Sequence, residues 1–314
     1  MKFIATVTLN PAFDLHYEME SLALRRENYV QSIRCDAGGK GVNISRALTV
    51  HGVPNTAFVV IGEENGASFA AALRRDGIDC VPFDAPGRIR ENITLHPAND
   101  SETRISLDTF RVPPELLTDV EAALSARCRP GDLLAFAGRN PRGPEKADVL
   151  GMLGRLIAAG VRTAVDSNSF TPEDLRSIRP WFIKPNEQEI GSFLGAPVRN
   201  PAEAARAASA LVRQGVAEQV MISLGGDGAV WSDGTRRLAL AVPRLQAPVS
   251  TIGAGDSTIA GFLAAAAQDL PVPDMLRQAV AFGTAACLTP GTQPPRPEDV
   301  SAILPQVRVS EIPD

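Results

Sequence analysis

Apolar runs alternate with amphipathic segments along most of the chain. The apolar runs predict buried strands at 2–9, 56–61, 132–137, 162–166, 181–184 and 219–224, followed by a meander at 228–231 and 236–241. The other segments have the period of a helix and predict helices at 40–52, 66–76, 114–127, 144–159, 172–177, 201–214, 255–268 and 273–288. Continuous apolar strands separated by helices are typical of a parallel sheet covered on both faces. The pattern therefore predicts an α/β fold with a doubly wound, mostly parallel sheet.

Two segments, about 11–36 and 79–110, interrupt this alternation. Within the second, short alternating runs at 92–96 and 103–107 flank a polar turn at 98–101, which indicates an antiparallel hairpin. We expect the two segments to form a small β-sheet that serves as a lid. Since the chain has no low-complexity linker, one domain spanning residues 1–314 is predicted.

The composition is that of an ordinary globular protein and excludes several function classes. Of 314 residues, 44% are apolar, 21% are charged and only 5% are aromatic, and the net charge is −5. Few aromatic side chains and an acidic balance argue against nucleic-acid binding and against an anionic membrane surface. An acidic protein that binds an anionic ligand must concentrate its cations locally. Clusters of arginine are therefore the feature to look for.

The cysteines and the N-terminus indicate a cytoplasmic protein. The four cysteines lie far apart and form no C-x-x-C pair, so reduced thiols are expected rather than a disulfide framework or a zinc site. The first residues run directly into a strand pattern without the layout of a signal peptide. The apolar stretch at 259–267 is too short to span a bilayer. No membrane segment is predicted.

The segment Gly253-Ala254-Gly255-Asp256 stands directly before an apolar helix. Small residues at a helix start leave backbone N–H groups free to bind an anion, and the helix dipole strengthens the site. An aspartate there can accept a proton from an attacking hydroxyl group. The alternative is that Asp256 is only a helix N-cap, a role that suits aspartate.

A second glycine-rich segment, Gly38-Gly39-Lys40, opens the helix that contains Asn43. Paired glycines allow close approach of a ligand or act as a hinge. The alternative is a helix-entry turn with a solvated lysine. The segment is not a P-loop, because Gly41 follows Lys40. No G-x-G-x-x-G follows the first strand, which argues against a dinucleotide-dependent enzyme.

Polar residues also follow two later strands. Lys184, Asn186 and Glu189 come directly after a buried strand, where parallel sheets place ligands, and they offer oxygens for a hydrated Mg²⁺. An N-cap asparagine with a capping-box glutamate explains the same pattern. The glycine-rich turn at 223–229 could bind nucleotide phosphates or simply form a hairpin.

Taken together and in this order, the segments resemble the ribokinase-like carbohydrate kinases, specifically the phosphofructokinase-B family. The resemblance runs from T-L-N-P-A-F-D at 8–14 to L-T-P-G-T at 288–292. The first segment and G-G-K-G-V-N-I-S are most similar to 1-phosphofructokinases and tagatose-6-phosphate kinases. The block at 87–92 matches the segment by which these enzymes hold a sugar phosphate.

The resemblance implies a kinase that uses ATP and Mg²⁺ to phosphorylate a ketohexose phosphate, and it implies a role for each matching residue. The catalytic group is Asp256, the base, with Gly253, Ala254 and Gly255 as its anion hole. The substrate residues are Asp14, Gly38, Gly39, Lys40, Asn43, Arg88, Arg90 and Asn92. ATP is bordered by Lys184, Asn186, Ser223, Gly225, Gly228 and Gly283, and the metal is organised by Asn186 and Glu189. A homodimer through the lid is common in the family.

One loop departs from the family pattern and bears on the substrate. The family usually reads S-G-S-L-P-x-G where this chain reads A-G-R-N-P-R-G at 137–143, so Arg139 replaces a hydroxyl that touches the substrate. Arg88 and Arg90 are two apart in a strand-like segment and would share one face. Our hypothesis is that Arg88, Arg90 and Arg139 converge on one phosphate.

The preferred reaction is phosphorylation of fructose 1-phosphate to fructose 1,6-bisphosphate. Kinases for tagatose 6-phosphate or fructose 6-phosphate are alternatives in the same family. A non-catalytic sugar-phosphate sensor and a nicotinamide-dependent oxidoreductase are rivals from other classes. The intact Asp256 and N-x-x-E argue against the sensor, and the missing dinucleotide motif argues against the oxidoreductase.

Overall fold

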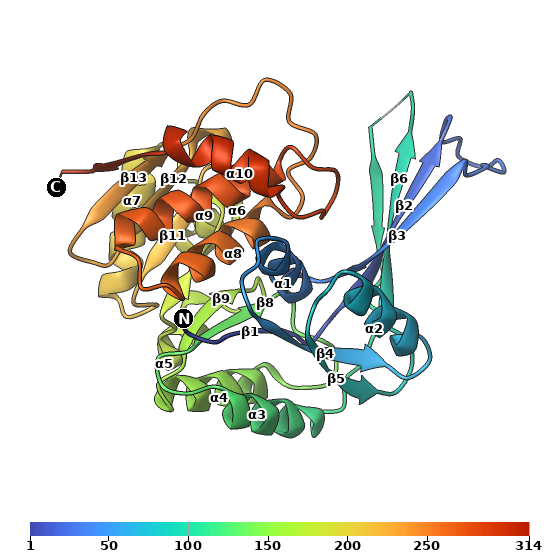
Figure 1. Cartoon of the computed structure of the whole chain (residues 1–314), viewed down its shortest axis with the longest axis horizontal. Coiled ribbons are helices and arrows are strands. Elements are labelled where there is room, and N and C mark those ends of the chain that lie inside the picture. The colour runs from blue at the N-terminus through green and yellow to red at the C-terminus, as the bar shows by residue number, and fades with distance from the viewer. Residues whose placement is uncertain (100, 314) are drawn as a thin grey trace.

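The large sheet is the scaffold of the molecule. The computed structural model describes residues 1–99 and 101–313, and in this part ten strands form one sheet in the order β14-β13-β12-β11-β10-β9-β8-β1-β4-β5 (Figure 1). The parallel strands are β1 (Ile4–Thr8), β4 (Thr56–Gly62), β5 (Cys80–Ala85), β8 (Leu133–Ala137), β9 (Arg162–Asp166), β10 (Phe182–Ile183) and β11 (Val220–Ser223). An antiparallel extension follows with β12 (Ala229–Ser232), β13 (Arg237–Ala241) and β14 (Arg308–Glu311).

Helices cover both faces of this sheet, as the alternation predicts. One face packs against α3 (Leu116–Arg127), α4 (Lys146–Ala158), α5 (Pro172–Ile178), α6 (Glu187–Leu194) and α7 (Pro201–Arg213). The other packs against α1 (Lys40–Val50), α2 (Gly66–Arg75), α8 (Ala254–Ala266), α9 (Val272–Ala286) and α10 (Pro297–Ile303). The sequence of β1 is continuously apolar because both faces of the strand are buried, with Ile4 in one core and Ala5 in the other. The predicted doubly wound α/β fold is confirmed.

A second sheet projects from one side of the molecule (Figure 1). Its four strands have the order β3-β2-β6-β7, namely β3 (Ser32–Gly38), β2 (Ala12–Met19), β6 (Arg90–Pro97) and β7 (Thr103–Ser106). Strand β2 pairs antiparallel with β3 and parallel with β6. We call these four strands the lid sheet. Their presence confirms the small sheet predicted from the interruptions of the helix–strand alternation.

The predicted boundaries of the lid need one correction. The segment 79–110 was assigned to the lid, but β5 pairs in parallel with β4 and forms an edge of the large sheet. An edge strand with one exposed face has the same alternation of apolar and polar residues as a lid strand, so the pattern could not separate them. The predicted turn at 98–101 includes Asp100, which lies outside the described residues. Helix α10 and strand β14 were not predicted.

Candidate active site

A cleft of about 930 Å³ opens at the carboxyl ends of the parallel strands and is lined by residues of both sheets. Most of the residues singled out from the sequence line it. They are Asp14, Gly39, Lys40, Asn43, Arg90, Asn92, Lys184, Asn186, Glu189, Ser223, Gly225, Gly228, Gly253, Ala254, Gly255, Asp256 and Gly283. Segments more than two hundred residues apart therefore meet in one place, at the edge where α/β sheets bind ligands.

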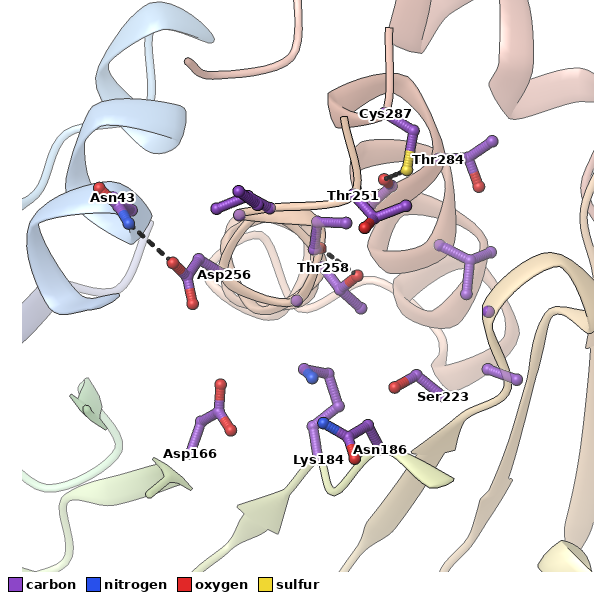
Figure 2. A pocket seen from close by; sticks show the side chains of 18 of the residues that line it. Asn43, Asp166, Lys184, Asn186, Ser223, Thr251, Asp256, Thr258, Thr284 and Cys287 are labelled. Carbon is purple, nitrogen blue, oxygen red and sulfur yellow. Dashed lines mark hydrogen bonds between the residues drawn. The ribbon is translucent and has the colours of Figure 1, made fainter. Parts of the chain in front are cut away.

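Asp256 occupies the first turn of α8 and faces the cleft. The helix N-cap is Gly253, and no side chain caps it, so the interpretation of Asp256 as an N-cap is wrong. The side chain is 7% exposed, and Asn43 Nδ2 donates a hydrogen bond to its Oδ2 at 2.8 Å (Figure 2). Burial raises the pKa of Asp256 to about 6, although Lys40, Asn43 and Lys184 act in the opposite direction. The carboxyl group is therefore ionised near neutral pH yet a stronger base than an exposed aspartate.

The backbone before Asp256 forms a turn that is suited to bind an anion, and we call it the anion-binding turn. Gly253 has φ +78°, a conformation that favours glycine. The first intrahelical bond runs from Ser257 N to Gly253 O, and Ala254 N donates to Thr251 O at 3.4 Å, so the N–H groups of Gly255 and Asp256 remain without an intrahelical acceptor at the helix start. A Cβ on Gly255 would lie 3.1 Å from Lys184 Nζ, which places this ammonium directly beside the turn. Backbone amides and a cation thus converge on one spot.

Lys40 lies beside two carboxylates. Its Nζ is 3.2 Å from Asp166 Oδ2, and the Asp166 side chain is buried at the end of β9. Burial alone would raise the pKa of Asp166, but Lys184 and Lys40 outweigh it and hold that pKa below its usual range. Burial would lower the pKa of Lys40, yet Asp166 and Asp256 hold it well above the ordinary value. The helix-entry turn of the alternative is present at Gly39, but Lys40 is ion-paired with Asp166 rather than free in solvent.

Asp166 is a site residue that the sequence analysis missed. It lines the cleft together with the predicted residues and faces Asp256 closely enough to help raise the pKa of the latter. A signal was present, because an acidic residue ends the predicted strand 162–166 at the carboxyl edge of a parallel sheet. Without a glycine-rich turn beside it, the residue looked like an ordinary strand end.

The lid-sheet side of the cleft carries a hydrogen-bonded network around Asp14. Asn92 Nδ2 donates to Asp14 Oδ1 at 2.8 Å, and Arg90 Nη1 donates to Asn92 Oδ1 at 2.8 Å. Arg90 Nε also donates to Asn10 Oδ1 at 2.9 Å. Arg104, which lines the cleft and lies 4.0 Å from Asp14 Oδ1, was not predicted because it stands in an alternating strand outside every motif. The network fixes a guanidinium and a carboxylate on the same wall.

The expected convergence of Arg88, Arg90 and Arg139 is only partly met. Arg88 precedes β6, which begins at Arg90, so the alternation argument does not apply to it. Its side chain is 58% exposed, lies 3.4 Å from Glu91 and is outside the cleft lining. Arg139 is exposed and also outside the lining, but it lowers the pKa of Arg90 and so lies near it. The hypothesis is wrong for Arg88.

Gly38 and Gly39 act differently from one another. Gly38 is buried behind Asp14 and does not line the cleft. A Cβ at this position would stand 2.1 Å from Asp14 Oδ2. Gly39 has φ +122°, and its Cβ would meet Thr8 Cγ2 at 2.8 Å. Gly38 thus makes room for the Asp14 carboxylate, while Gly39 turns the chain from β3 into α1.

The opposite wall is the turn between β11 and β12. Gly225 and Gly228 have φ +55° and +88°, and a Cβ on Gly228 would meet Leu240 O at 1.9 Å. The turn is therefore a hairpin connection, as one alternative held, and it also lines the cleft beside Ser223. A Cβ on Gly283 would meet Thr258 Oγ1 at 2.1 Å, so this glycine permits close packing of α9 on α8 at the cleft floor.

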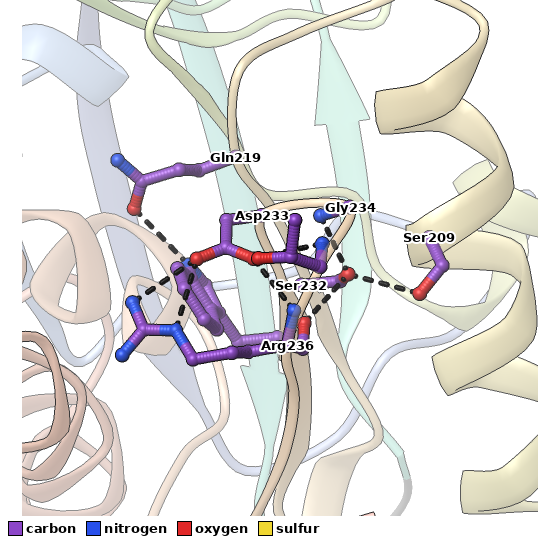
Figure 3. A network of polar contacts seen from close by, with 8 residues as sticks. Ser209, Gln219, Ser232, Asp233, Gly234 and Arg236 are labelled. Carbon is purple, nitrogen blue, oxygen red and sulfur yellow. Dashed lines mark hydrogen bonds and ion pairs between the residues drawn. The ribbon is translucent and has the colours of Figure 1, made fainter. Parts of the chain in front are cut away.

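A polar network holds the hairpin that follows this turn (Figure 3). The buried Ser232 hydroxyl contacts Ser209 Oγ at 2.9 Å, donates to Arg236 O at 2.9 Å and accepts from Gly234 N at 3.0 Å. The Arg236 guanidinium in turn donates to Asp233 Oδ2 at 3.0 and 3.1 Å. Satisfied polar groups on the far end of β12 and β13 stabilise the hairpin whose near end forms the cleft wall.

Asn186 and Glu189 form a capping box at the start of α6. Asn186 Oδ1 accepts from Gln188 N and from Glu189 N, both at 2.9 Å, and Glu189 Oε2 accepts from Asn186 N at 2.9 Å. The capping alternative is confirmed. Both lone pairs of the Asn186 oxygen are used, so Asn186 does not fit as a direct metal ligand. Glu189 keeps one carboxylate oxygen beyond the cap.

The donor set around Glu189 suits a hydrated cation. Among the described residues, no group of three or more His, Cys, Asp or Glu side chains could hold a metal by itself. Magnesium typically keeps several waters and binds through one or two carboxylates together with substrate phosphates. Glu189 and the buried Asp166 both line the cleft beside Lys184. These residues fit a magnesium ion that arrives with a nucleotide.

Comparison with known proteins identifies the family. The sequence model described as pfkB family carbohydrate kinase matches residues 7–299. The chain belongs to the pfkB family of carbohydrate kinases. The resemblance seen in the sequence is thereby confirmed, and a pfkB kinase is an enzyme of the transferase class rather than an oxidoreductase.

The relatives of this pfkB kinase that follow are named as phosphofructokinases. A 1-phosphofructokinase of Rhodobacter capsulatus is 33% identical over 316 residues, covering 99% of this chain and 98% of the relative. The ATP-dependent 6-phosphofructokinase isozyme 2 of Escherichia coli is 26% identical over 305 residues, covering 92% and 94%. The crystal structure of phosphofructokinase-2 from Escherichia coli in complex with potassium has the same fold, with a TM-score of 0.90 at 24% identity over 98% of this chain and 99% of that chain.

No helix within residues 1–99 and 101–313 has both the length and the apolar character needed to cross a bilayer.

Proposed function

We propose that this pfkB kinase transfers a phosphoryl group from MgATP to fructose 1-phosphate, forming fructose 1,6-bisphosphate, with Asp256 as the general base. The observation that carries the proposal is the place of Asp256. Its buried carboxylate stands at the helix start that forms the anion-binding turn, in a cleft with arginines on one wall and a glycine-rich turn on the other. The 1-phosphofructokinase at 33% identity supports the choice of sugar.

The two walls of the cleft suit different ligands, the sugar phosphate on the lid-sheet side and the nucleotide on the opposite side. Arg90 and Asp14 on the lid sheet suit a sugar phosphate, since a guanidinium fork matches a phosphate dianion and a carboxylate accepts from sugar hydroxyls. The glycine-rich turn between β11 and β12 leaves backbone room for a nucleotide. Asp256 lies between the walls and accepts the proton of the attacking hydroxyl group. The N–H groups of the Gly253–Gly255 turn and Lys184 stabilise the charge on the transferred group.

Magnesium and ATP fit this arrangement. Glu189 and Asp166 would hold the ion through its waters, and when bound it neutralises phosphate charge during transfer. Lys184 lies beside the anion-binding turn and suits the nucleotide phosphates. Closure of the lid sheet would exclude water and so limit wasteful hydrolysis of ATP. We retain a cytoplasmic location as part of the proposal, because ATP and sugar phosphates are found there.

We expect Glu189→Gln to raise the magnesium concentration needed for half-maximal activity. A neutral amide is a poorer partner for a hydrated dication than a carboxylate, whether the contact is direct or through water. A magnesium titration at saturating ATP measures the change. Glu187→Gln is the matched control, because Glu187 is a neighbouring exposed carboxylate that also lines the cleft. Identical titrations for Glu189→Gln and wild type would remove Glu189 from the metal site.

The choice of sugar is tested by measuring kcat/KM with fructose 1-phosphate, fructose 6-phosphate and tagatose 6-phosphate. We expect the highest value for fructose 1-phosphate. The second candidate is a 6-phosphate kinase, favoured by the similarity to a 6-phosphofructokinase isozyme and by Arg139, which changes the loop near Arg90. A preference for either 6-phosphate would overturn the assignment of fructose 1-phosphate. If the protein turns over ATP with none of these three sugar phosphates, the proposal as a whole is overturned.

A homodimer through the lid sheet is part of the proposal. The face of the sheet that points away from Asp14 carries Leu15, Tyr17, Ile33, Cys35, Ile93, Leu95 and Ile105. Ile33 is 64% exposed and Ile105 is 46% exposed in the single chain. A contiguous apolar face of this kind is typical of an interface, and a second copy offers the same apolar face in return.

We expect Ile33→Asp to convert the dimer to a monomer, because the charge would be buried against an apolar partner face. Light scattering coupled to size-exclusion chromatography measures the mass. Leu194→Asp is the control, since it introduces the same charge at an apolar residue that is 44% exposed at the end of α6, outside the lid sheet. If wild type is a monomer at all concentrations tested, the lid face is not a dimer interface.

A further inference from the structure

Arg46 is a buried charged residue of α1 outside the cleft lining and outside every motif used above. It is 5% exposed, and its guanidinium donates in three directions. Nε donates to Asp76 Oδ2 at 3.0 Å, Nη1 donates to Asn43 Oδ1 at 3.2 Å, and Nη2 donates to the backbone oxygen of Ala37. A buried guanidinium with three different acceptors is a fixed element of the structure.

The contact with Asn43 decides which way that amide faces. An asparagine side chain has one accepting oxygen and one donating nitrogen, and rotation by 180° exchanges them. Arg46 has donors only, so it holds the Asn43 oxygen on its own side. The nitrogen is then directed at Asp256, where it donates to Oδ2 at 2.8 Å (Figure 2). With the amide reversed, its oxygen would face a carboxylate oxygen and repel it.

We propose that Arg46 is a positioning residue for phosphoryl transfer, holding the Asn43 amide so that it donates to Asp256 and leaves the other carboxylate oxygen to the acceptor hydroxyl. The inference rests on the proposed function, in which Asp256 is the base. It goes beyond that function because Arg46 lies outside the cleft lining, touches neither Asp256 nor the anion-binding turn, and acts through a side chain three residues earlier on the same helix face.

The Arg46 guanidinium also contacts the lid sheet, at the end of strand β3. Ala37 is near the end of β3, just before the two glycines that lead into α1. Arg46 therefore fixes the lid strand and the Asn43 amide together, at the point where the lid joins the helix. Asp76, at the end of α2, holds the third side of the guanidinium and has no contact with Asn43 or Asp256. This separation between Asp76 and the site supplies a control.

Several charged groups face Asp256 and set its titration. Lys40 comes from α1, Asp166 ends β9 and Lys184 follows β10. Arg46 is not among the groups with the largest direct effects on the pKa of Asp256, whereas the hydrogen bond from Asn43 is among them and favours the ionised form. A change at Arg46 that leaves these three groups in place therefore reaches Asp256 through Asn43.

The test is the pH dependence of kcat/KM for the sugar phosphate in Arg46→Lys. Lysine keeps a positive charge for Asp76, but one ammonium group cannot replace a guanidinium that donates to Asp76, Asn43 and Ala37 at once. We expect the acidic limb to move up by roughly one pH unit, the size of one lost hydrogen bond to the charged form, with about a tenfold loss below the limb. Activity above the limb and KM for MgATP should stay close to wild type. The substrate phosphate also titrates near pH 6, but its titration is common to all variants compared.

Asp76→Asn is the matched control. It removes the ion pair but keeps an oxygen acceptor for Arg46 Nε, so the melting temperature should fall while the acidic limb stays in place. The double variant Arg46→Met with Asp76→Leu removes both charges together, so no unpaired charge remains buried if Arg46→Lys does not fold. It should show the same upward shift of the limb as Arg46→Lys.

The proposal is overturned if the acidic limb of the pH profile stays in place in either Arg46 variant. It is also overturned if the limb moves as far in Asp76→Asn as in Arg46→Lys. Failure of both Arg46 variants to fold also counts against it, since that would assign Arg46 to folding. Asp256→Asn in the same assay separates the two levels of inference. If that variant is inactive and the limb is unmoved, only the role of Arg46 fails. If Asp256→Asn retains full kcat, the base itself is wrong.

Discussion

Asp256→Asn is expected to lower kcat by about two to four orders of magnitude, the usual range for loss of a general base. The asparagine keeps the size of the side chain and can still accept the hydrogen bond from Asn43, so the loss isolates proton transfer. Steady-state kinetics at saturating ATP and sugar phosphate measure it. Asp227→Asn is the control, because Asp227 is an exposed carboxylate in the same cleft. A kcat near wild type would show that Asp256 is not the base.

The same substitution is expected to raise the melting temperature. The pKa of Asp256 lies at about 6 in the folded chain against a reference value of 3.8, because burial disfavours the charged form. The folded state therefore binds the proton more tightly than the unfolded state, and stability falls as the pH rises through about 6. Ionisation at neutral pH costs about 3 kcal/mol on this basis, and asparagine avoids it. The increase should be larger at pH 8 than at pH 5, and an equal change at both would contradict this explanation.

Arg90→Ala is expected to lower kcat/KM for the sugar phosphate by about tenfold to more than a hundredfold, the effect of losing one charge-assisted contact. Burial and the neighbouring Arg139 and Arg104 lower the pKa of Arg90, while Asp14 opposes them. Two neighbouring guanidinium groups thus repel that of Arg90 in a protein of net charge −5, and a phosphate dianion would relieve that repulsion.

The measurement compares each sugar phosphate with the same sugar lacking its phosphate. The loss in Arg90→Ala should be large for the first and small for the second. Arg88→Ala is the matched control, since Arg88 is two residues away, exposed and outside the cleft lining, and it should leave both values unchanged. Equal losses for both sugars would show that Arg90 holds the wall of the cleft, through Asn10 and Asn92, rather than the phosphate.

Features that depend on local sequence could be predicted without the structure. The continuous apolar strands and the intervening helices determined the doubly wound sheet, because burial on both faces leaves a distinct pattern in each strand. The turn at Gly253 and the one at Gly228 require backbone conformations that few residues adopt, so glycine marks them in the sequence. Asp256 was found because it stands directly beside such a turn.

Only the tertiary structure decided which residues meet. Asp166 enters the cleft from a strand end that no glycine-rich turn marks, and Arg104 enters it from a position that no local pattern marks. Arg88 lies outside the cleft lining although it is two residues from Arg90. The hydrogen bond from Asn43 to Asp256 joins residues 213 apart in the sequence. Strand pairing, helix packing and the direction of each buried side chain depend on groups distant in the chain, and a short segment carries no record of them. The sequence by itself therefore determined the fold class and indicated Asp256 as the candidate base, and the packing determined what surrounds Asp256 and sets its pKa.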